Sequence, residues 1–298
     1  MKRVVGISLG SSERDHSATI DIMGTSCQVE RIGTDGDMDR MIAIIKDLDG
    51  EVDAFGLGGI DRYVHAVDCR YEFRDARRIV QAAQKTPIVD GSGLKNTLER
   101  RVIEYLAEHT DLFKEPKRAL LICAMDRLGL AQALEKAGCI MTYGDVLFVL
   151  NLPFPLVSLN VLAVWARLLV PLLSRLPFRL VYPTGERQTE NKPRHVRYFM
   201  ENDIIAGDFH FIRRFAPLSL PGKVIITNTV TPADIEDLRN RQVKTLITTT
   251  PEMGGRSFGT NIMEALLVCL SGRGTELTEQ EYNRMLLELN LTPRIIHF

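Results

Sequence analysis

Short apolar strands alternate with amphipathic helices along most of this chain, and this alternation limits its fold more than any other feature. Residues 3–9, 117–124 and 243–248 are apolar runs of strand length, whereas Met38, Met41 and Ile45 recur at helical spacing. Strands that alternate with helices form mainly parallel sheets with helices on both faces. At 298 residues the chain is long for one core, so we expect two α/β domains.

The boundary between the two domains is predicted near residue 92. We expect an N-terminal α/β domain over residues 1–92 and a bridging helix over residues 93–116, in which Leu94, Leu98 and Val102 share one face. The second domain is predicted over residues 117–298 as a Rossmann-like, mainly parallel sheet with helices on both faces.

Composition excludes several classes of protein. With 45% hydrophobic and 25% charged residues the chain has an ordinary globular composition, and its net charge of −1 gives no field that would attract nucleic acid. The five cysteines are scattered, which fits buried thiols in a reducing, cytoplasmic location better than a disulfide framework. Because no spacing typical of metal ligands occurs, no metal is expected.

One long segment, residues 146–166, contains no charged residue. Its length is near that of a membrane span, but Pro153, Pro155 and Asn160 interrupt any helix through it. We therefore expect a strand, a loop and a buried helix with no membrane partner. A helix this apolar also fits a subunit interface, so a homodimer through residues 146–176 is predicted.

Turns rich in glycine and hydroxyl residues follow several of the predicted strands. In parallel sheets these turns lie at the carboxyl edge, where ligands bind. Arg256 adds a donor fork suited to a carboxylate or phosphate, so a small anionic metabolite is the expected partner. The candidate substrate-binding residues are Gly58, Gly59, Ser92, Asn96, Arg256, Ser257 and Asn261. The candidate cofactor-binding residues are Thr227, Asn228, Thr229, Thr248, Thr249, Thr250, Gly254 and Gly255.

Four residues are candidates for catalysis. Lys95 stands in the first turn of the bridging helix, an unfavourable place for a cation, and with Asp90 nearby it is a candidate acid and base. Asp208 and His210 follow an apolar strand at alternating positions, and such a pair can hold an imidazole for proton transfer. The alternatives are that Lys95 is an exposed surface lysine and that His210 is a hydrogen-bonded structural residue.

Four motifs together resemble the bacterial family labelled quinate 5-dehydrogenase: Phe55–Asp61, Val89–Thr97, Ala206–His210 and Thr248–Asn261. The resemblance implies kinship with shikimate and quinate dehydrogenases, in which a substrate domain precedes a nucleotide-binding domain, and it implies NAD or NADP as cofactor. The turn at residues 125–130 departs from this pattern, because it lacks the G-x-G-x-x-G that lets the backbone approach a pyrophosphate.

The leading hypothesis is therefore an NAD(P)-dependent oxidoreductase that acts on a small hydroxylated carboxylic acid in a cleft between the domains. The first alternative is a non-redox enzyme or transferase that binds a phosphorylated metabolite. The second is a non-catalytic, dimeric metabolite sensor.

Overall fold

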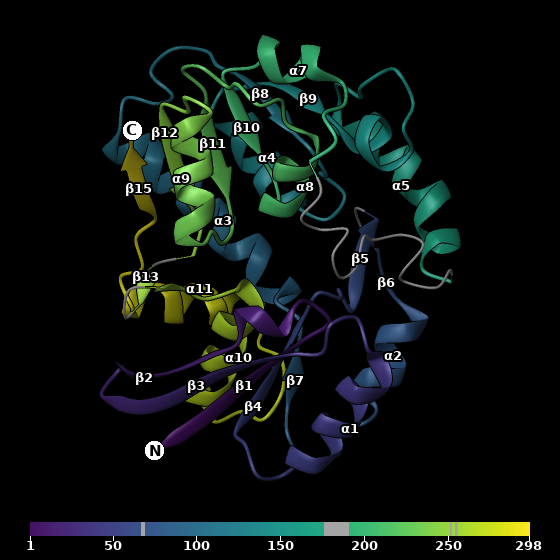
Figure 1. The fold of residues 1–298 in the computed structure, drawn as a ribbon, viewed down its shortest axis with the longest axis vertical. Helices are drawn as coiled ribbons and strands as arrows, with labels where there is room; N and C mark the ends of the chain where they lie inside the picture. Colours follow the sequence, from purple (N-terminus) through teal and green to yellow (C-terminus); the bar gives the residue numbers. More distant parts are fainter. Residues whose placement is uncertain (67–68, 176–190, 251, 254–255) are drawn as a thin grey trace.

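The chain forms two α/β lobes, one above the other (Figure 1). The computed structural model describes residues 1–66, 69–175, 191–250, 252–253 and 256–298. The expectation of two α/β domains with largely parallel sheets is confirmed. The sequence also predicts a strand at residues 178–182 and a polar loop at residues 184–194, and the strand and most of the loop lie outside the described residues.

The N-terminal lobe is built on a five-stranded sheet of order β2-β3-β1-β4-β7. The pairs β1/β3, β1/β4 and β4/β7 are parallel, and β2 pairs antiparallel with β3. Its strands are β1 (Lys2–Ser8), β2 (His16–Ile22), β3 (Thr25–Gly33), β4 (Ala54–Gly58) and β7 (Ile88–Val89), and the short turn η1 (Ser12–Arg14) precedes β2. A separate hairpin joins β5 (Tyr63–Ala66) to β6 (Cys69–Glu72).

Both faces of this sheet are covered. Successive residues of a strand point to opposite faces, so Val4 packs into one core and Val5 into the other. The helices α1 (Met38–Leu48) and α2 (Arg74–Val80) cover the face of Val5. The face of Val4 is covered by helices from the far end of the sequence, α10 (Thr260–Ser271) and α11 (Glu279–Glu288), which lie beside the purple strands in Figure 1.

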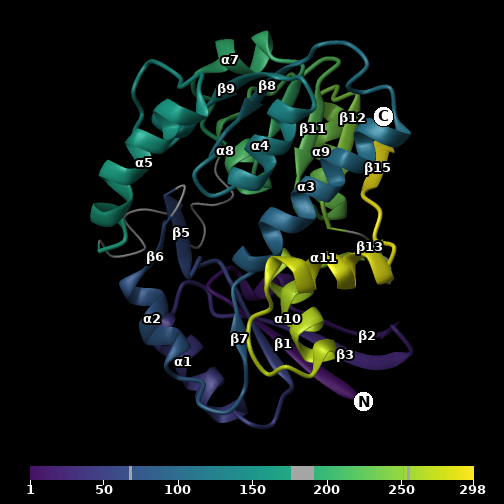
Figure 2. The same cartoon turned by 180° about the vertical axis from the view of Figure 1, so that it is seen from behind.

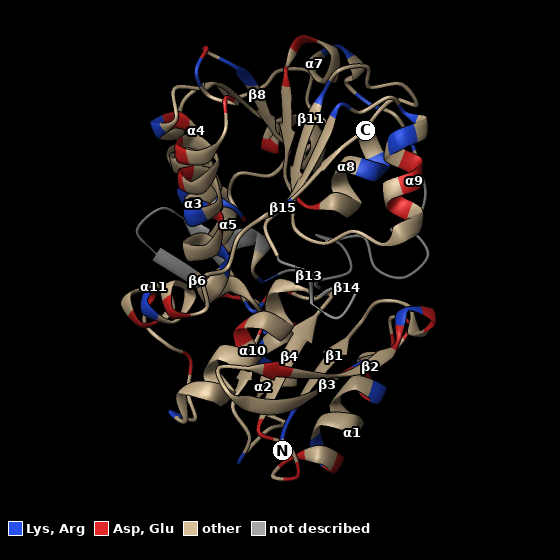
Figure 3. Ribbon diagram, turned by 90° about the vertical axis from the view of Figure 1, so that its left-hand side faces the viewer, with Lys and Arg blue, Asp and Glu red and all other residues tan. Residues whose placement is uncertain are grey.

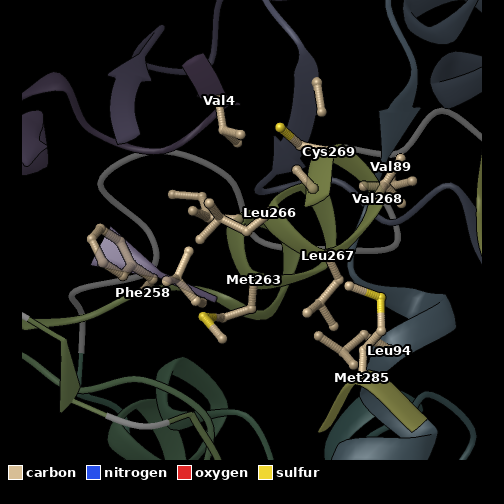
Figure 4. Close-up of a cluster of buried hydrophobic side chains, with 14 of the residues drawn as sticks. Val4, Val89, Leu94, Phe258, Met263, Leu266, Leu267, Val268, Cys269 and Met285 are labelled. Carbon is tan, nitrogen blue, oxygen red and sulfur yellow. The ribbon is translucent and has the colours of Figure 1, made fainter. Parts of the chain in front are cut away.

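Helix α10 is the main packing element of that face. Figure 4 shows its Met263, Leu266 and Leu267 lying among Val4, Val89 and Leu94 of the N-terminal lobe. The sequence analysis placed residues 258–291 in the second domain, whereas the structure packs them against the first. Only tertiary packing distinguishes the two arrangements, because an apolar helix fits the core of either lobe.

The C-terminal lobe holds a six-stranded sheet of order β15-β12-β11-β10-β8-β9. Every neighbouring pair is parallel except β12/β15, which is antiparallel. The strands are β8 (Arg118–Leu121), β9 (Ile140–Tyr143), β10 (Ile204–Ala206), β11 (Val224–Thr227), β12 (Thr245–Thr248) and β15 (Arg294–His297). Because β9 lies on one side of β8 and β10 on the other, the order of the strands reverses direction at β8.

Helices cover both faces of this sheet as well, as the view from behind shows (Figure 2). One face packs against α3 (Ser92–His109), α4 (Leu128–Lys136) and the start of α5 (Leu159–Leu173). The other packs against η2 (Asp145–Val149), α7 (Val196–Glu201), α8 (Phe209–Phe215) and α9 (Pro232–Asn240). Figure 3 shows charged residues gathered on helices and loops, while the strands of both sheets are largely uncharged.

Several segments connect the lobes. Leu94 and Leu98 of α3 pack in the N-terminal lobe, whereas Val102 and Leu106 of the same helix pack in the C-terminal lobe. The chain returns to the N-terminal lobe between β12 and α10, passing the short pair β13 (Glu252–Met253) and β14 (Arg256–Ser257), and crosses back between α11 and β15. These described segments are the places where the chain passes from one lobe to the other.

The apolar segment of residues 146–176 is partly exposed. Val157, Val164 and Leu168 are 72%, 54% and 71% exposed, whereas Ala166 and Val170 on the other side of α5 are buried in the N-terminal lobe. Pairing of two copies through this surface stays a prediction. Within the described ranges no helix has the length and apolarity that crossing a bilayer requires.

Candidate functional site

Charged side chains from both lobes meet at the carboxyl ends of the two sheets. Asp126 and Arg127 follow β8, and Asp208 follows β10, the neighbouring strand across the reversal. Asp61 follows β4 in the other lobe, and α3 brings Lys95 and Glu99 between them. We call these six residues the ionic cluster.

Lys95 is the centre of one half of the ionic cluster. Its Nζ lies 2.9 Å from both carboxylate oxygens of Asp126 and 3.6 Å from Oδ1 of Asp61, and its side chain is only 8% exposed. Burial alone would lower the pKa of Lys95, but the charges of Asp126 and Asp61 outweigh that effect and raise it. Lys95 therefore keeps its proton at neutral pH and is a hydrogen-bond donor to these carboxylates, and its role as catalytic acid and base stays a prediction.

Arg127 is the centre of the other half. One guanidinium nitrogen donates to Glu99, and the other donates to Oδ1 of Asp208 at 2.5 Å. Asn228, at the end of β11, donates to the same Asp208 oxygen at 2.5 Å. Burial would raise the pKa of Asp208, but the charge of Arg127 overcomes it and holds the pKa well below its usual range.

Two polar atoms in this half have no partner within the described part of the chain. Oε2 of Glu99 and Nε of Arg127 are buried without a hydrogen bond, although both side chains are only 1% exposed. A buried polar group left unpaired costs about 1–3 kcal/mol, so such atoms are normally paired. One of these atoms is an acceptor and the other a donor, and a hydroxyl group or a water molecule can pair with either.

The helix that carries His210 differs from the expectation. Asp208 and His210 were expected in a turn after a strand, at alternating positions, but β10 ends at Ala206, Gly207 has φ = +138°, and Asp208 is the N-cap of α8. His210 therefore lies in the first turn of α8, and the alternation that was to align it with Asp208 is absent. Burial lowers the pKa of His210 although the charge of Asp208 opposes the change, so the imidazole is neutral at pH 7.

The glycine turns of the N-terminal lobe meet at Asn261. A Cβ at Gly91 would lie 2.8 Å from the Asn261 nitrogen, one at Gly56 would lie 2.7 Å from its carbonyl oxygen, and one at Gly58 would lie 3.3 Å from its Nδ2. Gly59 and Gly91 also have positive φ, at +70° and +94°. These turns are glycine-rich because the start of α10 is packed directly against them.

Other candidate residues fasten this region internally. Asp90 accepts hydrogen bonds from the Ser92 nitrogen and hydroxyl and from the Arg62 nitrogen. Asp126 and Asp61, not Asp90, are thus the carboxylates paired with Lys95. Asn96 accepts from the Gly129 nitrogen at 2.9 Å and so fixes α3 against α4.

The hydroxyl-rich turns of the C-terminal lobe are likewise bonded to one another. Thr227 donates to the Gly207 carbonyl at 2.7 Å, and Thr248 donates to the carbonyl of Thr250 at 3.0 Å. Thr250 donates to the Asn228 carbonyl, Thr229 donates to that of Phe258, and the nitrogen of buried Thr249 donates to the Thr227 carbonyl. Gly254 and Gly255 lie outside the described residues, as do the side chains of Arg256 and Ser257 in β14.

Sequence reasoning missed four members of the ionic cluster: Asp61, Glu99, Asp126 and Arg127. Asp126 and Arg127 directly follow a predicted strand, which is the same signal that selected the other turns. They were passed over because their turn lacks the glycines of a nucleotide site. Glu99 lies one helical turn after Lys95, so the same helix face contains both.

The chain matches two known family models. Residues 93–298 match a family model described as a domain of unknown function (DUF8754). The chain belongs to this family. Residues 3–90 match a second model, also described as a domain of unknown function (DUF8753). No curated protein matches the chain.

The solved structures it resembles include solute-binding proteins of ABC transporters. One from Burkholderia multivorans has a TM-score of 0.37 and 12% identity, over 99% of this chain and 98% of that one. One from Bacillus halodurans with bound myo-inositol has a TM-score of 0.37 and 10% identity, over 99% and 94%. A periplasmic one from Actinobacillus succinogenes with bound D-allose has a TM-score of 0.37 and 10% identity, over 100% and 98%.

These comparisons correct several expectations. The relationship to quinate 5-dehydrogenases is wrong, because the family models that match residues 3–90 and 93–298 have other descriptions. The NAD(P)-dependent oxidoreductase derived from it is wrong for the same reason. The cytoplasmic location is not retained either.

The geometry gives a physical reason for the first correction. A dinucleotide site needs a glycine-rich turn after the first strand of the sheet, with free backbone N–H groups for the pyrophosphate. Here the turn after β8 instead presents Asp126 to Lys95, and its Ala124 and Met125 nitrogens already donate to Asp145.

Proposed function

We propose that this protein binds a small, uncharged, polyhydroxylated metabolite between its two lobes, at the ionic cluster. The observation that carries the proposal is the position of the cluster at the reversal of strand order between β8 and β10. In open α/β sheets ligands bind outside the carboxyl ends of the strands at such a point. Asp61 and Lys95 extend the same surface to the N-terminal lobe.

The chemistry of the cluster favours hydroxyl groups over anions. Four carboxyl groups face two cations, and both cations are already paired with carboxylates. A phosphate or carboxylate ligand would meet this excess of carboxyl groups, so the anionic metabolite expected from the sequence is not retained. Carboxylates, an amide and cationic donors together offer both acceptors and donors to sugar-like hydroxyls.

The unpaired atoms support the same ligand class. A hydroxyl group both donates and accepts, so hydroxyl groups or bridging waters would supply the partners that Oε2 of Glu99 and Nε of Arg127 lack.

Binding is tested by calorimetry and thermal shift with neutral pentoses, hexoses and cyclitols, including D-allose and myo-inositol. The phosphate esters of these compounds serve as comparisons. We expect at least one neutral polyol to raise the melting temperature of the protein, because a ligand that binds only the folded state stabilises it. If only phosphate esters bind, the proposed ligand class is wrong.

The role of the ionic cluster in ligand binding is tested with Asp126→Asn, which removes one carboxylate beside Lys95. We expect the Kd of the best polyol to rise at least about tenfold, a loss of about 1.4 kcal/mol. Asp111→Asn is the control, because Asp111 is 82% exposed and pairs only with Lys114 in the described structure. Asp208→Asn provides a second variant if the first does not fold, and unchanged affinity in both would remove the ionic cluster from the site.

A further inference from the structure

Asp145 is a buried carboxylate that holds the turn preceding the ionic cluster. It follows β9 and is 1% exposed. Its Oδ2 accepts a hydrogen bond from the Ala124 nitrogen at 3.0 Å, and its Oδ1 accepts one from the Met125 nitrogen at 2.9 Å. These two amides immediately precede Asp126 and Arg127 in the chain.

The turn after β8 depends on this outside support. The N-cap residue of α4 is Arg127, whose own side chain makes no capping hydrogen bond. The Arg127 nitrogen donates to the Ala124 carbonyl at 3.0 Å, so the turn that Asp145 holds is the one that fixes the Arg127 backbone. The direction in which Asp126 and Arg127 leave the sheet is set by this turn.

Close packing brings Asp145 to the turn. The Gly144 nitrogen donates to the Leu121 carbonyl at 2.8 Å. A Cβ at Gly144 would lie 2.6 Å from the Phe148 ring and 2.9 Å from the Ile122 carbonyl oxygen, so only glycine fits there without movement. The carboxylate next to it is therefore fixed against the end of β8.

We propose that Asp145 is a positioning residue for the ligand site: its ionised carboxylate holds the β8–α4 turn so that Asp126 reaches Lys95 and Arg127 reaches Glu99 and Asp208. This inference rests on the proposed function because the ligand site is the proposed one. The support that Asp145 gives to the turn does not depend on a ligand. When Asp145 takes up a proton, its hydroxyl oxygen becomes a poor acceptor, so one of the two amides loses its partner.

The surroundings of Asp145 make this protonation accessible near neutral pH. Burial raises the pKa of Asp145 to about 6, although the hydrogen bonds from Met125 and Ala124 oppose the rise. The titratable groups that face it are Cys123 after β8 and Tyr143 of β9, whose phenol donates to Glu135 of α4, with Asp126 beyond Cys123. Burial raises the pKa of both Cys123 and Tyr143, so both stay neutral while Asp145 titrates.

The experiment compares the whole wild-type protein with Asp145→Asn at pH 7. An asparagine accepts with one atom only, so we expect hydrogen exchange at Ala124 or Met125 to become at least about tenfold faster, in line with the loss of a hydrogen bond. Acetic anhydride labelling of Lys95, read by mass spectrometry, is expected to increase several-fold because its pairing with Asp126 loosens.

Asp203→Asn is the matched control. Asp203 accepts from the Arg118 nitrogen at 2.9 Å, which is the corresponding contact at the opposite end of β8. This variant should leave both readouts at the turn unchanged.

Wild-type protein provides a variant-free arm if Asp145→Asn does not fold. After correction for intrinsic exchange, protection of Ala124 or Met125 should fall between pH 7 and pH 5. Unchanged protection in the variant, or flat protection in the wild type, would overturn the role of Asp145. Faster exchange with unchanged Lys95 labelling would overturn its link to the ionic cluster. Both readouts are independent of the polyol panel, so failure of the proposed function is recognised separately.

Discussion

The protonation state of the Glu264 carboxyl group affects the stability of the region where α3 begins. It is fully buried in α10, accepts from the Gly91 nitrogen at 2.5 Å and from the Tyr282 hydroxyl at 2.5 Å, and lies near Asp90. Burial, followed by the charge of Asp90, raises the pKa of Glu264 to about 8. The folded protein thus holds this proton at neutral pH, whereas the unfolded chain releases it above its ordinary pKa of about 4.3.

The raised pKa of Glu264 makes the folded protein less stable as pH rises. Between about pH 4.3 and pH 8 the folded state binds more protons at this site than the unfolded state, so the unfolding free energy falls as pH rises, by up to about 1.4 kcal/mol per pH unit. We expect Glu264→Gln, which cannot ionise, to flatten this decline; its amide oxygen accepts from the Gly91 nitrogen, while its amide nitrogen donates to the Tyr282 oxygen in place of the original bond. Urea unfolding from pH 5 to pH 8 measures it, and a slope equal to that of wild type would contradict the assignment. Glu288→Gln on the exposed side of α11 serves as the control.

Residue-level reasoning from the sequence reached only part of the candidate site. Lys95 and Asp208 were identified from their positions at a helix start and a strand end, and both belong to the ionic cluster. Their partners were not identified, because Asp61 and Asp126 are separated from Lys95 by 34 and 31 positions in the sequence. Pairing over such separations is decided by how the sheets pack.

Helix α10 is the element whose position most changes the interpretation of the chain. Its apolar sequence predicts burial, and Met263, Ala265, Leu266 and Leu267 are all 0% exposed. That burial takes place against β1 and β4, more than 200 positions away in the sequence. Gly56 and Gly91 are required by the same packing, since a side chain at either position would collide with Asn261.

Truncating α10 should therefore destabilise the N-terminal lobe. We expect Leu266→Ala to lower the unfolding free energy by about 2–5 kcal/mol, because it removes buried methyl groups and leaves a cavity. Leu287→Ala in α11 is the control, since Leu287 is 61% exposed and should change stability by less than about 0.5 kcal/mol. Urea unfolding measures both, and equal effects would contradict the packing of α10.

At the scale of the whole molecule, the N-terminal lobe is made from both ends of the chain. A fragment of residues 1–92 would leave the face of Val4 and Val29 without α10 and α11. We expect this fragment to be unfolded or aggregated, because a sheet with one bare apolar face cannot bury enough surface. Adding residues 258–291 through a flexible linker should restore a cooperative thermal transition. Circular dichroism and calorimetry measure this, and cooperative folding of residues 1–92 alone would show that the C-terminal helices are dispensable.

The sequence by itself determined the class of fold. Alternating strands and helices predicted two α/β lobes, and the structure has them, because periodicity and turn residues act over a few positions. Only the tertiary structure decided that α10 and α11 return to the first lobe, that the strand order reverses at β8, and that Asp61, Lys95, Asp126, Arg127 and Asp208 meet. These features depend on contacts between distant segments, and a linear pattern of residue types does not specify which apolar face covers which.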